Sequence, residues 1–303
     1  MVSAEVFFMK FDSGNINRFS MNNHSKEDAV RTRLSSKRKE EIKAYADLVL
    51  GFHPQTDSGF DWAGVCEKEN IRVYFEYFPE DFDALIVYRN QRYTIFVNKK
   101  NLDDMPEYRV NFTICHELGH YFLPEHRYKL EREGMMQHQL RSDTRARPVE
   151  EREADVMASC LLMPAVQIGT DFAAQPFSPA FILDVANRYK VSRDACLMRY
   201  TELGPNPIML VYSENGRTDQ KAYHKKSKAF PFQKPLDMGD GRLPHCCLAS
   251  AANNNNLLPE LNVKRHLTRE IFGGFIPRNT PVALNEYCVP MHVKGRFLSV
   301  FYF

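Results

Sequence analysis

Two histidines and a glutamate between residues 116 and 120 have the spacing of a metal-binding site. The motif reads His116-Glu117-Leu118-Gly119-His120. On a helix, positions i and i+4 lie on one face one turn apart, so both imidazole rings can reach a single metal ion while Glu117 points toward a bound water. This combination is typical of metallopeptidases, in which the glutamate acts as a general base.

The residues around the motif indicate that it lies on a helix. Between residues 107 and 122 the apolar side chains recur at helical spacing; they are Val110, Phe112, Ile114, Cys115, Leu118, Tyr121 and Phe122. Residues 92–98 predict a strand, which could hold a peptide substrate by β-augmentation if it lies at a sheet edge. Gly119 is a weak helix former and is expected where the helix comes close to a neighbouring backbone. The competing interpretation is a buried amphipathic helix with two incidental histidines.

A catalytic zinc usually takes three protein ligands and keeps a fourth position for water, so a third donor is needed. His126 lies ten residues after His116, where the metzincin pattern places its third histidine. That pattern requires glycine at position 123, and this chain has Leu123 followed by Pro124. We therefore expect His126 to be a surface residue or to lie behind the ligands.

Glu151 is the second candidate, on a helix predicted between Pro148 and Pro164. Glu151 and Asp155 share one face of that helix. One carboxylate can complete the ligand set while the other accepts an N–H from a ligand histidine and fixes its tautomer. The alternative is a set of acidic residues favoured at a helix start by the helix dipole: Glu150, Glu151, Glu153 and Asp155.

Together these segments resemble one family, the ImmA/IrrE metallopeptidases of bacteria and phages. The family pattern is T-x-A-H-E-[LI]-[GS]-H, then E-x-x-A-[ND]-x-[FA]-A, then L-L-M-P. This chain has matching segments at 113–120, 151–158 and 161–164, with Cys115 where alanine is usual, Asp155 where asparagine is common and Met157 where phenylalanine is common. Residues 71–73 and 95–98 also look like the family's strands. The resemblance runs from about residue 40 to 205.

The resemblance implies that His116, His120 and Glu151 bind the metal, that Glu117 is the catalytic carboxylate, and that the core has a zincin-like α+β fold. The cofactor is then Zn²⁺, with Mn²⁺ as an alternative, because two imidazoles and one carboxylate can hold either ion. Glu117 would take a proton from water and pass it to the leaving amine. A group that stabilises the oxyanion is also required. The candidates near in sequence are His126, Tyr128 and His138.

Length and composition allow one large or two moderate domains. The chain has 303 residues, of which 44% are hydrophobic, and a net charge of +2 with a pI near 8.1. This small net charge does not indicate binding to nucleic acid or to a membrane surface. The seven cysteines include no C-x-x-C pattern, and no apolar run is long enough for a signal or a membrane span. We therefore expect a cytoplasmic protein.

The chain divides into four predicted segments. Residues 1–25 are a polar arm, 26–170 the zincin-like metallopeptidase domain, 171–204 a helix-turn-helix-like segment, and 205–303 a β-rich or α+β domain with a sensor or regulatory role. A helix is predicted from Ser25 to Leu50, and its basic run 31–39 is interpreted as a solvated face rather than a nucleic-acid patch. Residues 127–150 predict a flap over the cleft or a solvated insertion.

The sequence indicates the roles of residues 171–204 and 205–303 less clearly than that of the histidine motif. The helix pair in 171–204 is expected to support the core rather than to read DNA, for which it offers only Arg193 and Arg199. In the last segment, strands are predicted at 208–212, 280–284, 287–291 and 297–303. Cys246, Cys247 and His245 lack ligand spacing and are expected to be packing residues.

These observations predict a metal-dependent endopeptidase that cleaves a specific protein partner. By the resemblance, the partner is a helix-turn-helix transcriptional repressor in a stress, phage or mobile-element response. The alternative is a regulator or antitoxin-type binding protein that holds metal without turnover, and a DNA-binding regulator is the weakest interpretation. Glu117 favours catalysis, because metal binding alone does not require it. The pattern does not indicate an oligomeric state.

Overall fold

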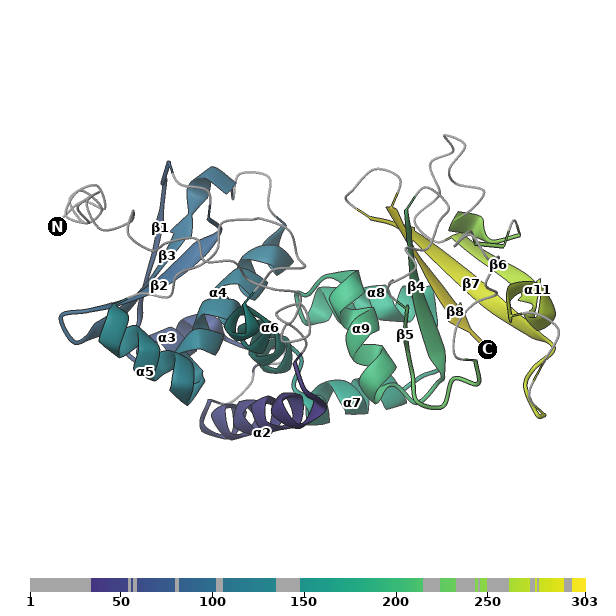
Figure 1. The fold of residues 1–303 in the computed structure, drawn as a ribbon, viewed down its shortest axis with the longest axis horizontal. Coiled ribbons are helices and arrows are strands. Elements are labelled where there is room, and N and C mark those ends of the chain that lie inside the picture. The colour runs from purple at the N-terminus through teal and green to yellow at the C-terminus, as the bar shows by residue number, and fades with distance from the viewer. Residues whose placement is uncertain are drawn as a thin grey trace, which may run out of the picture. The chain divides into compact units, whose positions relative to one another are not determined.

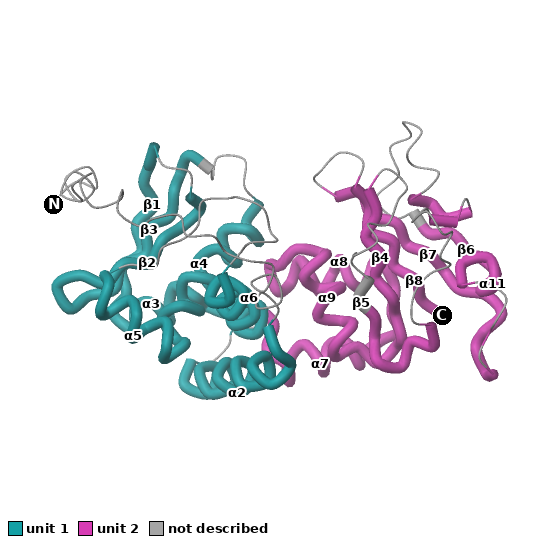
Figure 2. Tube along the Cα trace, viewed as in Figure 1, with its two compact units in different colours: residues 1–162 teal, residues 163–303 magenta. Residues whose placement is uncertain are grey.

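The computed structural model describes residues 34–53, 56, 59–79, 82–101, 106–134, 148–214, 224–232, 243–244, 246–249, 262–272, 276, 278–291 and 296–303. The chain forms two compact units, residues 1–162 and 163–303 (Figure 2). The polar arm predicted at 1–25, His138, His245 and most of the expected flap lie outside the described residues. The boundaries between the four predicted segments stay predictions.

The sheet of the first unit has strand β3 (Arg92–Asn98) at its centre. Strand β1 (Arg72–Glu76) pairs with β3 in parallel, and β2 (Ala84–Arg89) pairs with it antiparallel (Figure 1). The strand predicted at 92–98 is confirmed. Because β3 is hydrogen-bonded on both sides, the idea that it adds a substrate strand at a sheet edge is wrong.

Strand β2 was missed in the sequence analysis. Its buried run Ala84–Val87 joins β3 through a two-residue turn at Asn90 and Gln91. Both turn residues have positive φ, 53° and 58°, as hairpin turns that match the strand twist require. The order β1-β3-β2 makes β2 an edge strand of this sheet.

Helix α4 (Glu107–Phe122) carries the histidine motif and packs on strands β2 and β3 and on helix α6 (Val149–Leu162). The helices predicted at 107–122 and between Pro148 and Pro164 are confirmed. Fully buried side chains fill the space between these elements: Ile86, Ile95, Val97, Ile114, Leu118, Met157 and Leu161. The 3-10 turn η1 (Lys99–Asn101) and helix α3 (Trp62–Lys68) complete the connections around the sheet.

Two sequence predictions in this unit need correction. Helix α2 (Ser36–Phe52) begins at Ser36 and not at Ser25, because the Ser35 side chain caps it by accepting the backbone N–H of Arg38 at 3.1 Å. Residues 127–133 belong to helix α5 (Pro124–Glu133) and not to a flap. Proline at the first position and left-handed Gly134 just after the end fix both boundaries of α5.

The second unit begins with three helices, α7 (Ala165–Ala173), α8 (Pro179–Arg188) and α9 (Arg193–Leu203). Arg199 on α9 is buried, and its guanidinium donates to the backbone oxygen of Met163 at 3.1 Å. Arg193 donates to the hydroxyl of Tyr287 at 3.1 Å. Arg199 is therefore not exposed as a base-reading side chain has to be.

The remainder of the second unit is an antiparallel sheet with the order β5-β4-β8-β7-β6. Its strands are β4 (Ile208–Glu214), β5 (His224–Lys226), β6 (Asn262–Leu267), β7 (Ala283–Pro290) and β8 (Arg296–Tyr302), with the short helix α11 (Thr268–Phe272) after β6. The strands predicted near 208–212 and 297–303 are confirmed. Those predicted at 280–284 and 287–291 are wrong as separate strands, because one strand, β7, runs through Asn285.

The mixed architecture of helices and two sheets confirms the predicted α+β class. All seven cysteines are free thiols. Among the described residues no single helix is long and apolar enough to cross a membrane, although the bent pair α6 and α7 meets that test jointly by length and composition.

Candidate metal centre

Helices α4 and α6 approach closely at Gly119. A Cβ atom on Gly119 would lie 3.0 Å from the backbone oxygen of Ala154 and 3.2 Å from its Cα. Most Cβ atoms keep a larger distance from backbone atoms than this, so glycine permits the approach, as expected from the sequence. His116 and His120 flank Gly119 on α4, and Glu151 precedes Ala154 on α6. The close approach therefore brings the three side chains together.

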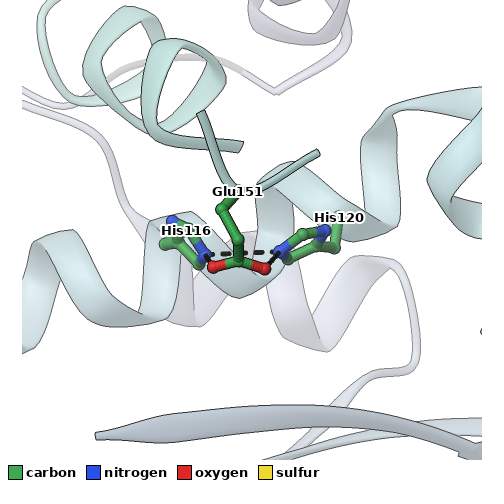
Figure 3. Close-up of side chains that lie close together, drawn as sticks. All are labelled: His116, His120 and Glu151. Carbon is green, nitrogen blue, oxygen red and sulfur yellow. Dashed lines mark hydrogen bonds and ion pairs between the residues drawn. The ribbon is translucent and has the colours of Figure 1, made fainter. Parts of the chain in front are cut away.

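The ligand atoms of His116, His120 and Glu151 form a compact triangle. The two Nε2 atoms lie 3.2 Å apart. The Glu151 carboxylate lies between the rings, with one oxygen 3.3 Å from Nε2 of His116 and the other 3.4 Å from Nε2 of His120 (Figure 3). All three residues are buried.

This donor set fits a divalent metal ion. In a tetrahedral zinc site with bonds of about 2.0–2.1 Å, neighbouring ligand atoms lie about 3.3 Å apart. The separation of the two Nε2 atoms, 3.2 Å, matches one edge of that tetrahedron. Each Nε2 also has one Glu151 oxygen at a similar distance, 3.3 Å for His116 and 3.4 Å for His120. Two imidazoles and one carboxylate are also a common ligand set for catalytic zinc, which keeps the fourth position for water.

Asp155 holds the first ligand histidine from behind. Its Oδ1 lies 3.0 Å from Nδ1 of His116, on the side of the ring away from the donor triangle. If Nε2 of His116 faces the metal position, its Nδ1–H donates to Asp155, which fixes the tautomer and the ring orientation. Asp155 therefore lies behind His116, and its support of a metal ligand stays a prediction.

His126 holds the second ligand histidine in the same way. Its Nδ1 lies 3.0 Å from Nδ1 of His120, and its Nε2 lies 3.0 Å from Oε2 of Glu153. If His120 donates from Nδ1, His126 accepts there and carries its own proton on Nε2, which donates to Glu153. One set of tautomers therefore satisfies both hydrogen bonds, from His120 to His126 and from His126 to Glu153.

Arg38 of helix α2 extends this row of hydrogen-bonded side chains beyond Glu153. Its guanidinium donates two hydrogen bonds of 2.9 Å to the Glu153 carboxylate, and also contacts Glu125 at 3.2 Å. A bidentate pair of this kind is strong and directional. Burial raises the pKa of Glu153, but Arg38 outweighs burial and lowers it overall. Glu153 is thereby kept as the charged acceptor that His126 needs.

The three imidazoles differ in charge because their surroundings differ. Burial lowers the pKa of His116, but hydrogen bonds to Asp155 and Glu151 outweigh burial and raise it to about 9. Burial lowers the pKa of His120. Burial, together with the neighbouring His120, lowers the pKa of His126 to about 4. Near neutral pH, the protein without metal therefore holds a proton on His116, while His120 and His126 are neutral.

Glu117 is anchored to the sheet beside the donor triangle. One oxygen of its buried carboxylate accepts the backbone N–H of Ile86, on edge strand β2, at 2.9 Å. The negative charge of Glu117 favours the protonated form of both histidines, although burial still lowers the pKa of His120 overall. The carboxylate is thus held in one orientation, and its charge acts on both histidines of the donor triangle.

The structure describes two of the three residues considered for oxyanion stabilisation, and neither is placed for that role. His126 lies behind His120. Tyr128 is exposed on α5, and its ring lies beside the guanidinium of Arg132. His138 lies outside the described residues. The group that would stabilise an oxyanion therefore stays unassigned.

Sequence reasoning missed Arg38, the supporting role of Glu153 and the backbone of Ile86. Arg38 looked like one member of a solvated basic run. Glu153 lies on α6 two residues after Glu151, and two residues are about 200° apart around a helix. That spacing indicated a different face from Glu151, but the sequence did not show that His126 would meet it there.

Comparison with known proteins gives one family and one related fold. The model of the IrrE N-terminal-like domain, a peptidase family, matches residues 66–201. No curated protein sequence matches the chain. Among solved structures, a protein described as a Mycobacterium tuberculosis transcriptional regulator is similar in fold, with a TM-score of 0.51 and 13% sequence identity over 88% of this chain and 78% of that protein.

Proposed function

Because residues 66–201 form an IrrE N-terminal-like domain with a zincin-like fold, we propose that the protein is a zinc-dependent endopeptidase that cleaves one specific protein partner. The observation that carries this proposal is the donor triangle of His116, His120 and Glu151, with the anchored carboxylate of Glu117 beside it. The family supports the reaction class, and the triangle supports the metal.

Each residue has a distinct task in the proposed reaction. His116, His120 and Glu151 would hold the ion, which when bound lowers the pKa of water and polarises the scissile carbonyl. Glu117 takes the proton from the attacking water and returns it to the leaving amine. Asp155 and His126 keep the two ligand rings in the tautomer that presents Nε2 to the metal.

We propose that the partner is a DNA-binding repressor of the helix-turn-helix class, so that cleavage changes transcription. Two features support this: the resemblance to the ImmA/IrrE family, and a fold neighbour that is itself described as a transcriptional regulator. The ion is proposed to be zinc, with manganese as the alternative.

The test compares metal content and cleavage across four proteins: wild type, Glu117→Gln, Glu151→Ala and His126→Ala. Metal is measured by mass spectrometry after dialysis. Each protein is then incubated with candidate repressors, beginning with any encoded beside its gene, and the products are identified by intact-mass analysis. Wild type should bind metal and cleave one repressor at one bond.

The variants separate binding from chemistry. Glu117→Gln should keep its metal and lose about 10²- to 10⁴-fold in cleavage rate, whereas Glu151→Ala should lose both metal and cleavage. His126→Ala should keep metal at saturating concentration. Normal metal binding without cleavage of any substrate would support the non-catalytic regulator instead, and retention of metal by Glu151→Ala would refute the ligand assignment.

A further inference from the structure

Three potential metal ligands meet in the second unit, in a group separate from the donor triangle. Cys246 lies in the turn at 246–249, His266 near the end of strand β6, and Glu270 in helix α11. One ligand atom from each lies within 4.8 Å of the other two. We propose that Cys246, His266 and Glu270 form a second metal site, which binds a thiophilic divalent cation, Zn²⁺.

The orientation of His266 favours this role. Its Nε2 lies 2.9 Å from Oε2 of Glu286, a carboxylate that is fully buried. A histidine that donates from Nε2 keeps its lone pair on Nδ1. A carboxylate behind a histidine whose second nitrogen faces a metal is the usual support of a zinc ligand. Glu286 thus stands to His266 as Asp155 stands to His116.

The same buried carboxylate also positions the turn that carries the thiol. Glu286 accepts the backbone N–H of Leu248 at 2.8 Å and the hydroxyl of Ser299 at 2.6 Å. A second bond holds the turn to strand β6, because the Lys264 ammonium donates to the backbone oxygen of Cys246 at 2.8 Å. The backbone that carries the thiol is therefore held to the strands that carry His266 and Glu286 before any ion binds.

Exposure increases across the three residues, which gives an ion a route to the site. His266 is buried, Cys246 is partly exposed and Glu270 is exposed. Glu270 is nevertheless held in place, since one of its carboxylate oxygens accepts the backbone N–H of Leu267 at 3.0 Å. Three protein ligands with one side open to solvent leave a coordination position for water or for a further ligand.

The donor types select the cation. One sulfur, one imidazole nitrogen and one carboxylate oxygen suit zinc and other late first-row divalent ions, whereas magnesium and calcium prefer oxygen ligands alone. A packing role would account for the bond between His266 and Glu286. It would not account for a thiol and a second carboxylate beside the same ring. Cys247 and Cys288, in contrast, are buried in the apolar core of this unit, where cysteine acts as a small hydrophobic residue.

The test uses the difference in donor atoms between the two groups. The donor triangle of the first unit contains no sulfur, so only the second site can give the thiolate-to-cobalt charge-transfer absorption in the near ultraviolet when the full-length protein is titrated with Co²⁺. Wild type and His120→Ala should both show this absorption. Zinc content measured by mass spectrometry should be about two equivalents per chain in wild type and about one in His120→Ala.

Cys246→Ser should abolish the absorption, and Cys247→Ser, its matched neighbour, should leave it unchanged. Glu270→Gln alters an exposed side chain and therefore tests the site without disturbing the core; it should weaken Co²⁺ binding about tenfold or more. Circular dichroism melts in the presence of chelator confirm that each variant folds. No thiolate absorption in wild type, or absorption that survives Cys246→Ser in the folded protein, would refute the site.

Discussion

Nδ1 of His120 and Nδ1 of His126 lie 3.0 Å apart in the interior of the first unit. Two imidazole nitrogens at this distance share one proton, so one ring donates and the other accepts. The low pKa of His126, about 4 because of burial and the neighbouring His120, keeps that ring neutral and able to accept. His126 therefore orients the His120 ring of the donor triangle.

Replacing His126 with alanine should weaken metal binding without abolishing it. The substitution removes the acceptor that orients His120. Loss of a residue that hydrogen-bonds to a metal ligand lowers metal affinity ~10- to 100-fold. Competition with a chelator of known affinity measures the change, with His120→Ala as the reference for loss of a ligand. If both variants lose metal equally, His126 is itself a ligand.

Replacing Arg38 with methionine should destabilise the first unit by about 1–3 kcal/mol, because it leaves the Glu153 carboxylate without its bidentate partner. Urea denaturation of the metal-free protein gives the free energy of unfolding. Lys37→Met is the matched control, since the Lys37 side chain is 88% exposed, and should change stability by about 0.5 kcal/mol or less. Similar losses in the two variants would contradict a specific role for Arg38.

Replacing Gly119 with alanine should force helices α4 and α6 apart. The added methyl would lie 3.0 Å from the backbone oxygen of Ala154, and overpacking of this kind costs about 1–3 kcal/mol. Metal affinity should fall together with thermal stability, because the same shift separates Glu151 from the histidines. Gly169→Ala is the control: its Cβ would meet nothing within 4 Å, so the better helix former should be neutral or stabilising. Equal effects at the two glycines would argue against close helix packing as the cause.

Metal affinity should rise with pH up to about pH 9. In the metal-free protein the pKa of His116 is raised from 6.5 to about 9, because its hydrogen bonds to Asp155 and Glu151 outweigh burial. Metal binding must displace that proton, so each pH unit below 9 should cost about tenfold in affinity, and the dependence should level off above it. In Asp155→Asn the dependence should level off at lower pH. A flat profile between pH 6 and 8 in wild type would contradict a protonated His116.

The raised pKa of His116 also makes the stability of the metal-free protein depend on pH. A pKa that is higher in the folded than in the unfolded chain stabilises the fold below the unfolded value and ceases to do so as pH rises through the folded value. The His116 contribution is therefore fully present below about pH 6.5 and lost toward pH 9. Thermal melts of the protein in chelator across this range measure it, with Asp155→Asn as the comparison.

The sequence predicted the parts of the site that depend on helical period. The i, i+4 spacing placed His116 and His120 on one face, and the bounds of strand β3 and helix α4 follow from clear periodic patterns and their flanking turns. The acidic helix supplied Glu151 and Asp155 one turn apart, as the structure has them. Gly119 indicated a close approach to a neighbouring backbone, which the structure shows to be that of α6 at Ala154.

Long-range contacts were not predictable in the same way. Nothing in a basic run identifies which arginine will meet a carboxylate 115 positions later, as Arg38 meets Glu153. The strand β2 was missed because a short apolar run has no alternation to distinguish a strand from a helix segment. The separate strands predicted around Asn285 failed for the opposite reason, since polar residues inside β7 looked like a break.

The bond between Arg38 and Glu153 also bears on how far the chain can be shortened around the donor triangle. The family match begins at residue 66, but helix α2 lies ahead of it and supplies the only cation that the described residues place on Glu153. A fragment trimmed to residues 66–201 would keep every proposed ligand and still lack this counter-charge. A version intended for crystallisation, or for grafting onto another protein, therefore has to start ahead of Ser35, where the cap of α2 begins.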